Sequence, residues 1–180
     1  MSLSRRSLLG LGLGGAALLA CGGLALRGSR LRTPAHALKV LSETEYSVLA
    51  AIADRVAPSG EGFPPAHELE VAEHIDALLA SAHPGIAMEI KQALLLVENA
   101  LAALLFDGRY DTFTASPPEV QDQIWADWSD SSLETRRTVY KALTGLCTGT
   151  YWANESLWEG IGYPGPPDLS ALTTAIGADR

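Results

Sequence analysis

The chain has 180 residues, of which 47% are hydrophobic, and it carries 13 Lys and Arg against 21 Asp and Glu. This length suits a single domain with a sizeable core. A formal charge of −8 argues against a protein that binds nucleic acid through a basic face. Two cysteines are too few for a disulfide framework, a zinc ribbon or an iron–sulfur cluster, which needs about four ligands.

The first 37 residues differ from the rest, because they hold five arginines and no acidic residue. A twin-arginine export pattern is followed by an apolar, Gly-rich stretch over residues 8–26, and this order is typical of a bacterial export signal. A transmembrane helix of about 20 residues is the alternative, but the glycines weaken a helix and arginines flank both ends. We therefore predict a twin-arginine signal peptide over residues 1–37 and a periplasmic location, or one on the outer face of the cytoplasmic membrane. The pattern consists of Ser4, Arg5, Arg6, Leu8 and Leu9.

The signal has three alternative fates. Ala35-His36-Ala37 is a small-x-small site, and cleavage after Ala37 would leave a domain over residues 38–180. Residues 18–21, Leu-Leu-Ala-Cys, resemble a lipobox that would acylate Cys21, although the apolar run continues past that residue. We favour cleavage at Ala37 over lipidation, and an uncleaved anchor is the third option.

The sequence of residues 38–150 predicts a bundle of about five helices. Ser42 is expected to cap the first helix through its side chain, and the Glu45 side chain to accept a hydrogen bond from the Ser42 N–H. Pro58 is expected to end this helix. Tyr46, Leu49 and Ile52 fall on one face at helical spacing. The second and third helices are predicted at about 66–82 and 86–106, and Asp107-Gly108 is expected to end the third. A fourth helix is predicted from Ser116-Pro117-Pro118-Glu119 onward, and a fifth from a capping box of Ser131 and Glu134 onward. No strand alternation is present, so the fold class is all-α.

The pattern changes after about Tyr151. Residues 151–167 contain four aromatic residues, three Gly and three Pro, which is incompatible with a long helix. The segment is irregular, yet too aromatic for a solvated tail. Its rings need a surface to lie on, which is either this bundle or another protein.

The chain offers little catalytic chemistry. It lacks a phosphate-binding loop, a dinucleotide-binding glycine pattern, a GxSxG motif and a CxxCH haem attachment site. His67, Glu70 and His74 would share one face of the second helix and could hold a divalent metal, but an acidic solvent-facing surface explains them more simply. Cys147 is interpreted as a buried, inert thiol. No catalytic, cofactor-binding or metal-ligating residue is therefore predicted.

The order of these landmarks resembles the gluconate 2-dehydrogenase subunit 3 family. The resemblance covers most of residues 1–167 and is carried by four blocks: the twin-arginine signal; Leu41-Ser42-x-x-Glu45 continuing through Ala51-Ile52-Ala53-Asp54-Arg55 to Pro58; Val71-Ala72-Glu73-His74-Ile75-Asp76; and the closing Trp158-Glu159-Gly160-Ile161-Gly162-Tyr163-Pro164-Gly165-Pro166.

The resemblance implies a non-catalytic small subunit of a dehydrogenase complex. The partner would be a flavoprotein of the glucose–methanol–choline type that carries FAD and oxidises a sugar or polyol, and a c-type cytochrome subunit often accepts the electrons. The small subunit would supply the export signal to the twin-arginine translocase and stabilise the flavoprotein. Buried aromatic residues carry much interface energy, so we predict a partner interface at Trp152, Trp158, Tyr163, Pro164 and Pro166. The alternatives are a free-standing lipoprotein anchored at Cys21, and a metal-binding protein using His67, Glu70 and His74.

Overall fold

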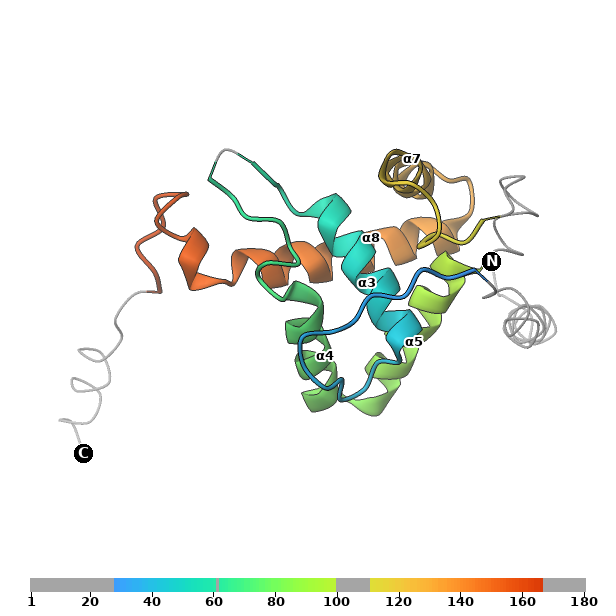
Figure 1. Cartoon of the computed structure of the whole chain (residues 1–180), viewed down its shortest axis with the longest axis horizontal. Helices are drawn as coiled ribbons and strands as arrows, with labels where there is room; N and C mark the ends of the chain where they lie inside the picture. Colours follow the sequence, from blue (N-terminus) through green and yellow to red (C-terminus); the bar gives the residue numbers. More distant parts are fainter. Residues whose placement is uncertain (1–27, 61, 100–110, 167–180) are drawn as a thin grey trace, which may run out of the picture.

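The structure, a computed structural model, describes residues 28–60, 62–99 and 111–166 (Figure 1). Within these ranges it contains five α-helices and one short 3-10 helix, and no β-sheet. The predicted all-α bundle is therefore confirmed. The export-signal residues and Cys21 lie outside the described residues. The third helix, predicted to run to about Phe106, ends at Glu98 instead, because its C-cap Asn99 has extended backbone angles of φ −70° and ψ 106°. The helices are α3 (Glu43–Val56), α4 (Val71–Ser81), α5 (Pro84–Glu98), α7 (Pro118–Ser129), α8 (Glu134–Trp152) and the 3-10 helix η1 (Glu155–Leu157).

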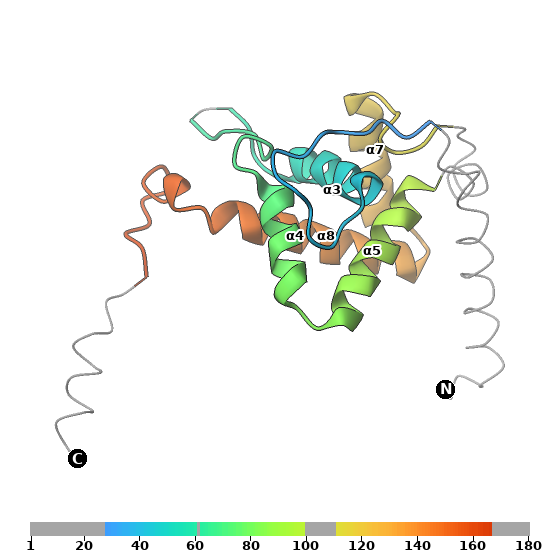
Figure 2. The same ribbon diagram turned by 60° about the horizontal axis from the view of Figure 1, so that its bottom comes forward.

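Helix α3 forms the centre of the bundle, with α4, α5, α7 and α8 packed around it (Figure 2). The sequence predicts one apolar face for this helix, but every residue from Glu45 to Ala53 is buried. Small side chains such as Ala50 and Ala51 let neighbouring elements approach closely on the sides that the larger residues do not occupy. Complete burial of a side chain such as Leu49 contributes about 1.5–3 kcal/mol.

The predicted capping box at the start of α3 is confirmed. The Ser42 hydroxyl accepts a hydrogen bond from the Glu45 N–H, and the Glu45 carboxylate accepts one from the Ser42 N–H at 2.7 Å. Glu45 is itself buried, and the Lys91 ammonium lies 3.4 Å from its carboxylate. The helix ends at Val56, two residues before Pro58, as the sequence indicates. An N-terminal side-chain cap such as Ser42 stabilises a helix by about 1 kcal/mol.

Residues 28–41, here called the N-terminal strap, cross the bundle surface over α3 and then turn along α4 (Figures 1 and 2). Asp76 of α4 anchors the end of the strap, and the residue is only 3% exposed. It accepts three backbone hydrogen bonds, from the N–H groups of Lys39 at 2.6 Å, Val40 at 3.0 Å and Leu41 at 2.8 Å. The strap therefore covers the part of α3 that the helices leave open.

The second helix begins later than predicted. The sequence indicates a start near Ala66, but α4 begins at Val71 because Glu70 has left-handed backbone angles of φ 50° and ψ 37°. Residues 66–70 form irregular turns instead, with the Val71 N–H donating to the Ala66 carbonyl at 3.2 Å. An α-helix cannot continue through a left-handed residue.

The starts of α7 and α8 compare differently with the prediction. Helix α7 begins at Pro118, inside the predicted Ser116-Pro117-Pro118-Glu119 start, with Pro117 as its N-cap, and the Ser116 hydroxyl donates to the Thr112 carbonyl. Helix α8 starts at Glu134 with Leu133 as its N-cap, so the predicted box of Ser131 and Glu134 does not form. The Ser131 hydroxyl accepts the Leu133 N–H at 3.2 Å, in a turn that precedes the helix.

Candidate functional site

The aromatic residues at the end of α8 fasten that helix to the loop after α3. Tyr151 is fully buried, and its hydroxyl lies within hydrogen-bonding distance of two backbone carbonyl oxygens, 3.1 Å from Pro58 and 2.8 Å from Pro64. Burial raises the pKa of the Tyr151 hydroxyl, so it stays a donor. The half-buried Trp152 ring meets the Phe63 ring edge to face, with 5.6 Å between centroids. These two rings therefore pack mainly on their own chain.

The following residues, 153–166, form a separate ordered unit that we call the closing segment. Asn154 starts it by accepting the Ser156 N–H at 3.0 Å, which sets up the 3-10 helix η1. The Tyr163 N–H then donates to the Trp158 carbonyl at 2.8 Å, which closes a turn that includes Gly162 at φ 69°. A positive φ suits glycine because it has no Cβ. The irregular Gly/Pro-rich end predicted from sequence thus has a defined conformation.

The turn brings two of the predicted interface rings together. Trp158 and Tyr163 pack edge to face with centroids 5.2 Å apart, and the Trp158 indole N–H donates to the Trp152 carbonyl at 3.2 Å. Trp158 is half-buried, whereas Tyr163 is 44% and Ile161 48% exposed. The predicted interface prolines, Pro164 and Pro166, are also exposed.

The closing segment projects from one end of the bundle, beside the loop that joins α3 to α4 (Figure 1). That loop folds back on itself through paired backbone hydrogen bonds of 3.0 Å between Gly60 and Phe63. Gly160 of the closing segment lies so close to the Phe63 ring that a Cβ added at Gly160 would be 3.5 Å from a ring carbon. The loop therefore contacts the closing segment at Gly160, while the side chains of Ile161 and Tyr163 remain exposed.

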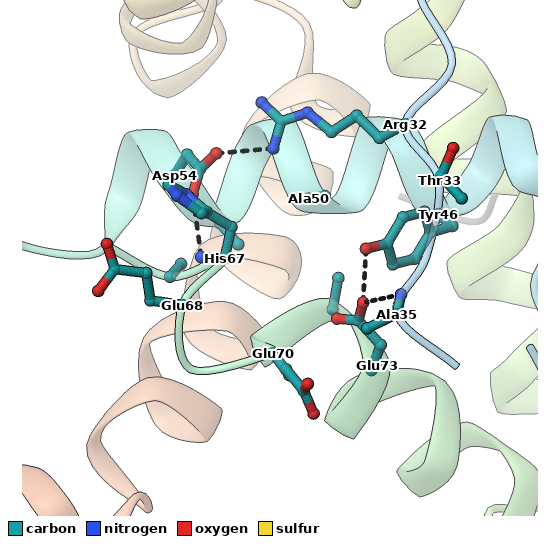
Figure 3. A pocket seen from close by; sticks show the side chains of 13 residues that line it. Arg32, Thr33, Ala35, Tyr46, Ala50, Asp54, His67, Glu68, Glu70 and Glu73 are labelled. Atoms are coloured by element: carbon teal, nitrogen blue, oxygen red, sulfur yellow. Dashed lines mark hydrogen bonds and ion pairs between the residues drawn. The ribbon is translucent and has the colours of Figure 1, made fainter. Parts of the chain in front are cut away.

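A cavity of about 500 Å³ lies between the N-terminal strap, α3 and the turns before α4 (Figure 3). Asp54 projects into it, with Arg32 Nη1 at 2.7 Å and His67 Nδ1 at 3.0 Å from its carboxylate oxygens. Across the cavity the Tyr46 hydroxyl donates to Glu73 at 2.6 Å. Burial, together with this hydrogen bond and the charge of Glu73, raises the pKa of Tyr46, so it is not a base at neutral pH.

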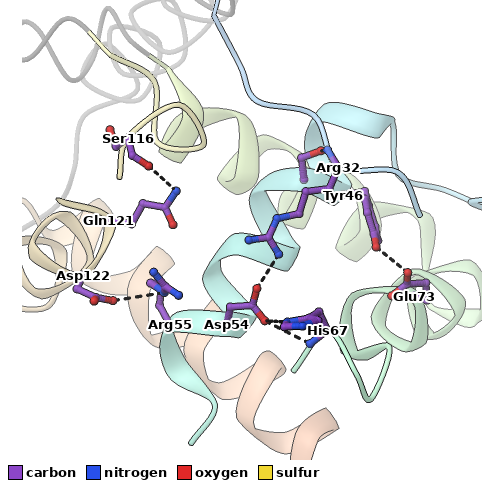
Figure 4. Close-up of polar contacts among 10 residues, drawn as sticks. Arg32, Tyr46, Asp54, Arg55, His67, Glu73, Ser116, Gln121 and Asp122 are labelled. Carbon is purple, nitrogen blue, oxygen red and sulfur yellow. Dashed lines mark hydrogen bonds and ion pairs between the residues drawn. The ribbon is translucent and has the colours of Figure 1, made fainter. Parts of the chain in front are cut away.

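Asp54 and Arg55 are adjacent in sequence but pair with different elements (Figure 4). Asp54 contacts Arg32 of the strap and His67 before α4, whereas Arg55 Nε lies 3.4 Å from a carboxylate oxygen of Asp122 in α7. The two residues therefore connect α3 to three other parts of the bundle. Arg32 and Tyr46 were missed as partners by the sequence analysis, because their contacts are made between distant segments.

The metal-binding alternative is wrong for the described residues. His67 precedes α4 instead of lying on it, so the helical spacing from His67 to His74 does not exist. His67 and Glu70 line the cavity beside the strap, whereas His74 lines a different groove between α4 and α8. Across residues 28–60, 62–99 and 111–166, no three His, Cys, Asp or Glu side chains are grouped so that they could hold a metal ion.

Cys147 lies on the buried side of α8, as predicted, and burial raises the pKa of its thiol to about 12. A thiol of this kind is protonated and unreactive at neutral pH. None of the helices in the described part of the chain is both long and apolar enough to cross a bilayer.

These observations define an all-α bundle in which a partly exposed aromatic segment follows the last long helix. The chain belongs to the gluconate 2-dehydrogenase subunit 3 family, whose model matches residues 43–165, about two thirds of the sequence. The match begins at the first residue of α3 and ends within the closing segment, so it includes both Trp158 and Tyr163. Comparison with curated proteins and with solved structures gave no match.

Proposed function

We propose that this chain is the non-catalytic small subunit of an FAD-dependent alcohol or sugar dehydrogenase complex of the glucose–methanol–choline type. The observation that carries the proposal is the family match over residues 43–165, because a third subunit implies a complex with other dehydrogenase subunits. The flavoprotein supplies the FAD and the catalytic residues, and a c-type cytochrome subunit takes the electrons onward. The complex works in the periplasm or on the outer face of the cytoplasmic membrane.

The small subunit has two roles in this proposal. Its twin-arginine pattern, Arg5-Arg6, directs the folded complex to the translocase, so that a flavoprotein without its own signal is exported. Its closing segment binds and stabilises the flavoprotein through the exposed surface at Ile161 and Tyr163. The exposed aromatic and apolar residues of this surface are typical of an interface core.

Affinity purification of the tagged full-length chain from its own host tests the assignment. We expect a flavoprotein of the stated type to co-purify, with a flavin absorption spectrum and dehydrogenase activity on a sugar or polyol. A colourless chain that purifies alone would remove the functional assignment. The lipoprotein alternative predicts that the chain stays in the membrane after the flavoprotein gene is deleted. It also predicts that the Cys21→Ala variant is then released from the membrane.

The interface is tested by substituting exposed residues. Tyr163→Ala and Ile161→Ala should each weaken the complex at least about tenfold, because interface anchors often contribute about 2 kcal/mol or more. Met88→Ala is the matched control, since Met88 is an exposed apolar residue on α5 far from the closing segment in sequence. Equal binding by all three variants would refute the proposed surface. Trp158→Ala tests the same interface only if the far-UV circular dichroism remains that of a folded bundle.

The carrier role is tested separately. Changing Arg5 and Arg6 to Lys should leave both this chain and the flavoprotein in the cytoplasm, as measured by fractionation. A flavoprotein that still reaches the periplasm would refute the carrier role while leaving the subunit assignment intact.

A further inference from the structure

The N-terminal strap is fixed to the bundle at several separate points. Its backbone and side chains contact α3, α4 and the segment before α7, which are far apart in the sequence. The hydrogen bonds that hold it upstream of Leu38 include those of Arg30 N–H to Thr114 Oγ1 at 2.9 Å, Arg32 N–H to Ser47 Oγ at 2.8 Å, Arg32 Nη1 to Asp54 Oδ2 at 2.7 Å, and Ala35 N–H to Glu73 Oε1 at 3.2 Å.

The strap also determines what is buried on α3. Ser47 has no exposed surface, and its hydroxyl donates to the Glu43 carbonyl while it accepts the Arg32 N–H. The Asp54 side chain is only 11% exposed where Arg32 covers it. Removing residues 28–37 would leave Ser47 without its strap donor and Asp54 without its arginine partner. Asp54 would keep its contacts with His67, but the ion pair with Arg32 and the hydrogen bond to Ser47 would be lost, and this polar face of α3 would be uncovered.

The bond between Ala37 and Leu38 lies between two anchored points of the strap. Ala35 is held upstream by Glu73, and residues 39–41 are held downstream by Asp76. A peptidase must draw several residues on each side of its bond into an extended conformation, which requires local opening of bound backbone. Ala35, His36 and Ala37 are themselves exposed, so the hindrance to cleavage after Ala37 comes from the anchored backbone on either side of the bond and not from burial of the bond.

We propose that the strap is a permanent part of the mature subunit, so that signal processing occurs before Gly28 and not between Ala37 and Leu38. This proposal rests on the proposed export of the chain. Lipidation at Cys21, cleavage at another bond before Gly28 and retention of the whole signal are all compatible with it. The strap contacts three separated elements, so it docks only after the bundle has assembled. The folded domain therefore begins at Gly28, immediately after the signal.

The mature N-terminus of the complex recovered from its own host decides between the two cleavage predictions. We expect intact-mass and N-terminal analysis to give a chain that contains Gly28 to Ala37. A chain starting at Leu38, or at any residue after Gly28, would overturn the proposal. Substituting Ala37→Leu, which blocks a small-x-small site, should leave the mature N-terminus unchanged, whereas a longer mature chain in that variant would contradict the proposal.

Hydrogen exchange on the purified full-length chain tests the docked strap without relying on export. The Arg32 and Leu41 amides should be protected, and Ser47→Ala should speed exchange of the Arg32 amide by a few-fold to about tenfold, the effect of one ordinary hydrogen bond. The Leu41 amide, held by Asp76, serves as the internal control and should be unaffected. Strap amides that exchange at unfolded-peptide rates in the unsubstituted chain would refute the docked strap.

The two measurements separate the possible failures. A chain found only in the cytoplasm, with the strap amides protected, would refute export while supporting the strap as part of the fold. An exported chain that starts at Leu38 would support export and overturn the retained strap.

Discussion

Asp76→Asn tests how strongly the bundle depends on its buried anchor for the strap. The substitution keeps the shape of the side chain but removes the charge and replaces one acceptor oxygen with an NH2 group. Asp76 is almost fully buried, and its two oxygens accept hydrogen bonds from three backbone N–H groups. Asparagine can turn only one oxygen toward these donors, so at least one N–H must face another donor.

The size of the effect follows from these contacts. A hydrogen bond to a charged group contributes about 1.5–3 kcal/mol, and one between neutral groups about 0.5–1.5 kcal/mol. Losing one charged bond and weakening the other two should lower the free energy of unfolding by about 3 kcal/mol. Because Asp76 is 3% exposed, solvent screening reduces this value little. A loss of this size is a large part of the stability of an ordinary domain, about 5–15 kcal/mol.

Urea unfolding of the purified full-length chain, followed by far-UV circular dichroism, measures the loss. Asp127→Asn is the matched control, because Asp127 is exposed on α7 and its side chain, among the described residues, accepts a hydrogen bond only from the Gln123 side chain. We expect no measurable change in that variant. Equal stabilities for Asp76→Asn and the unsubstituted chain would show that the strap amides do not depend on this carboxylate.

Two further substitutions on α8 give separable results. Tyr151→Phe should lower the free energy of unfolding by about 1–2 kcal/mol, since the carbonyls of Pro58 and Pro64 lose a buried donor. Tyr140→Phe is the control and should change the free energy of unfolding little, because the Tyr140 hydroxyl has no hydrogen bond among the described residues. Similar losses in the two variants would refute the role of the Tyr151 hydroxyl. The pKa of the Cys147 thiol is about 12 in the folded chain against an ordinary 9.0, so the unfolded state loses its proton first and stability falls as pH rises from about 9 toward 12. Comparing free energies of unfolding from about pH 8 to about pH 10, we expect a shallower decline in Cys147→Ala, and parallel declines would contradict the burial of the thiol.

The features that follow from neighbouring residues could be predicted from the sequence. The capping box of Ser42 and Glu45 and the end of α3 before Pro58 depend on contacts within a few residues, and the structure reproduces both. The all-α class likewise follows from periodicity and capping. Cys147 follows from its position in an apolar stripe, because a residue on that side of a helix is buried in most packed bundles.

The strap could not be predicted, because nothing local distinguishes it. Residues 28–41 have no periodic pattern, and their conformation is set by hydrogen bonds to partners 15–84 residues away. The start of α4 failed for a related reason. The run from Ala66 to Val71 contains good helix formers, but Glu70 adopts left-handed angles, and His67 contacts Asp54 instead of joining the helix. Tertiary contacts override helix propensity at such positions.

The sequence also leaves open whether the closing aromatic residues pack on this chain or on a partner, and the structure divides them. Tyr151 lies inside because the loop after α3, about 90 residues earlier, offers it two carbonyl oxygens. Tyr163 lies outside because the turn at Gly162 fixes it against Trp158 instead of against the bundle core. A ring held in place before binding loses less conformational freedom when a partner covers it, so more of its contact energy becomes affinity. The packing of Trp152 and Trp158 on their own chain is therefore compatible with a partner interface, because these contacts hold the exposed surface in shape.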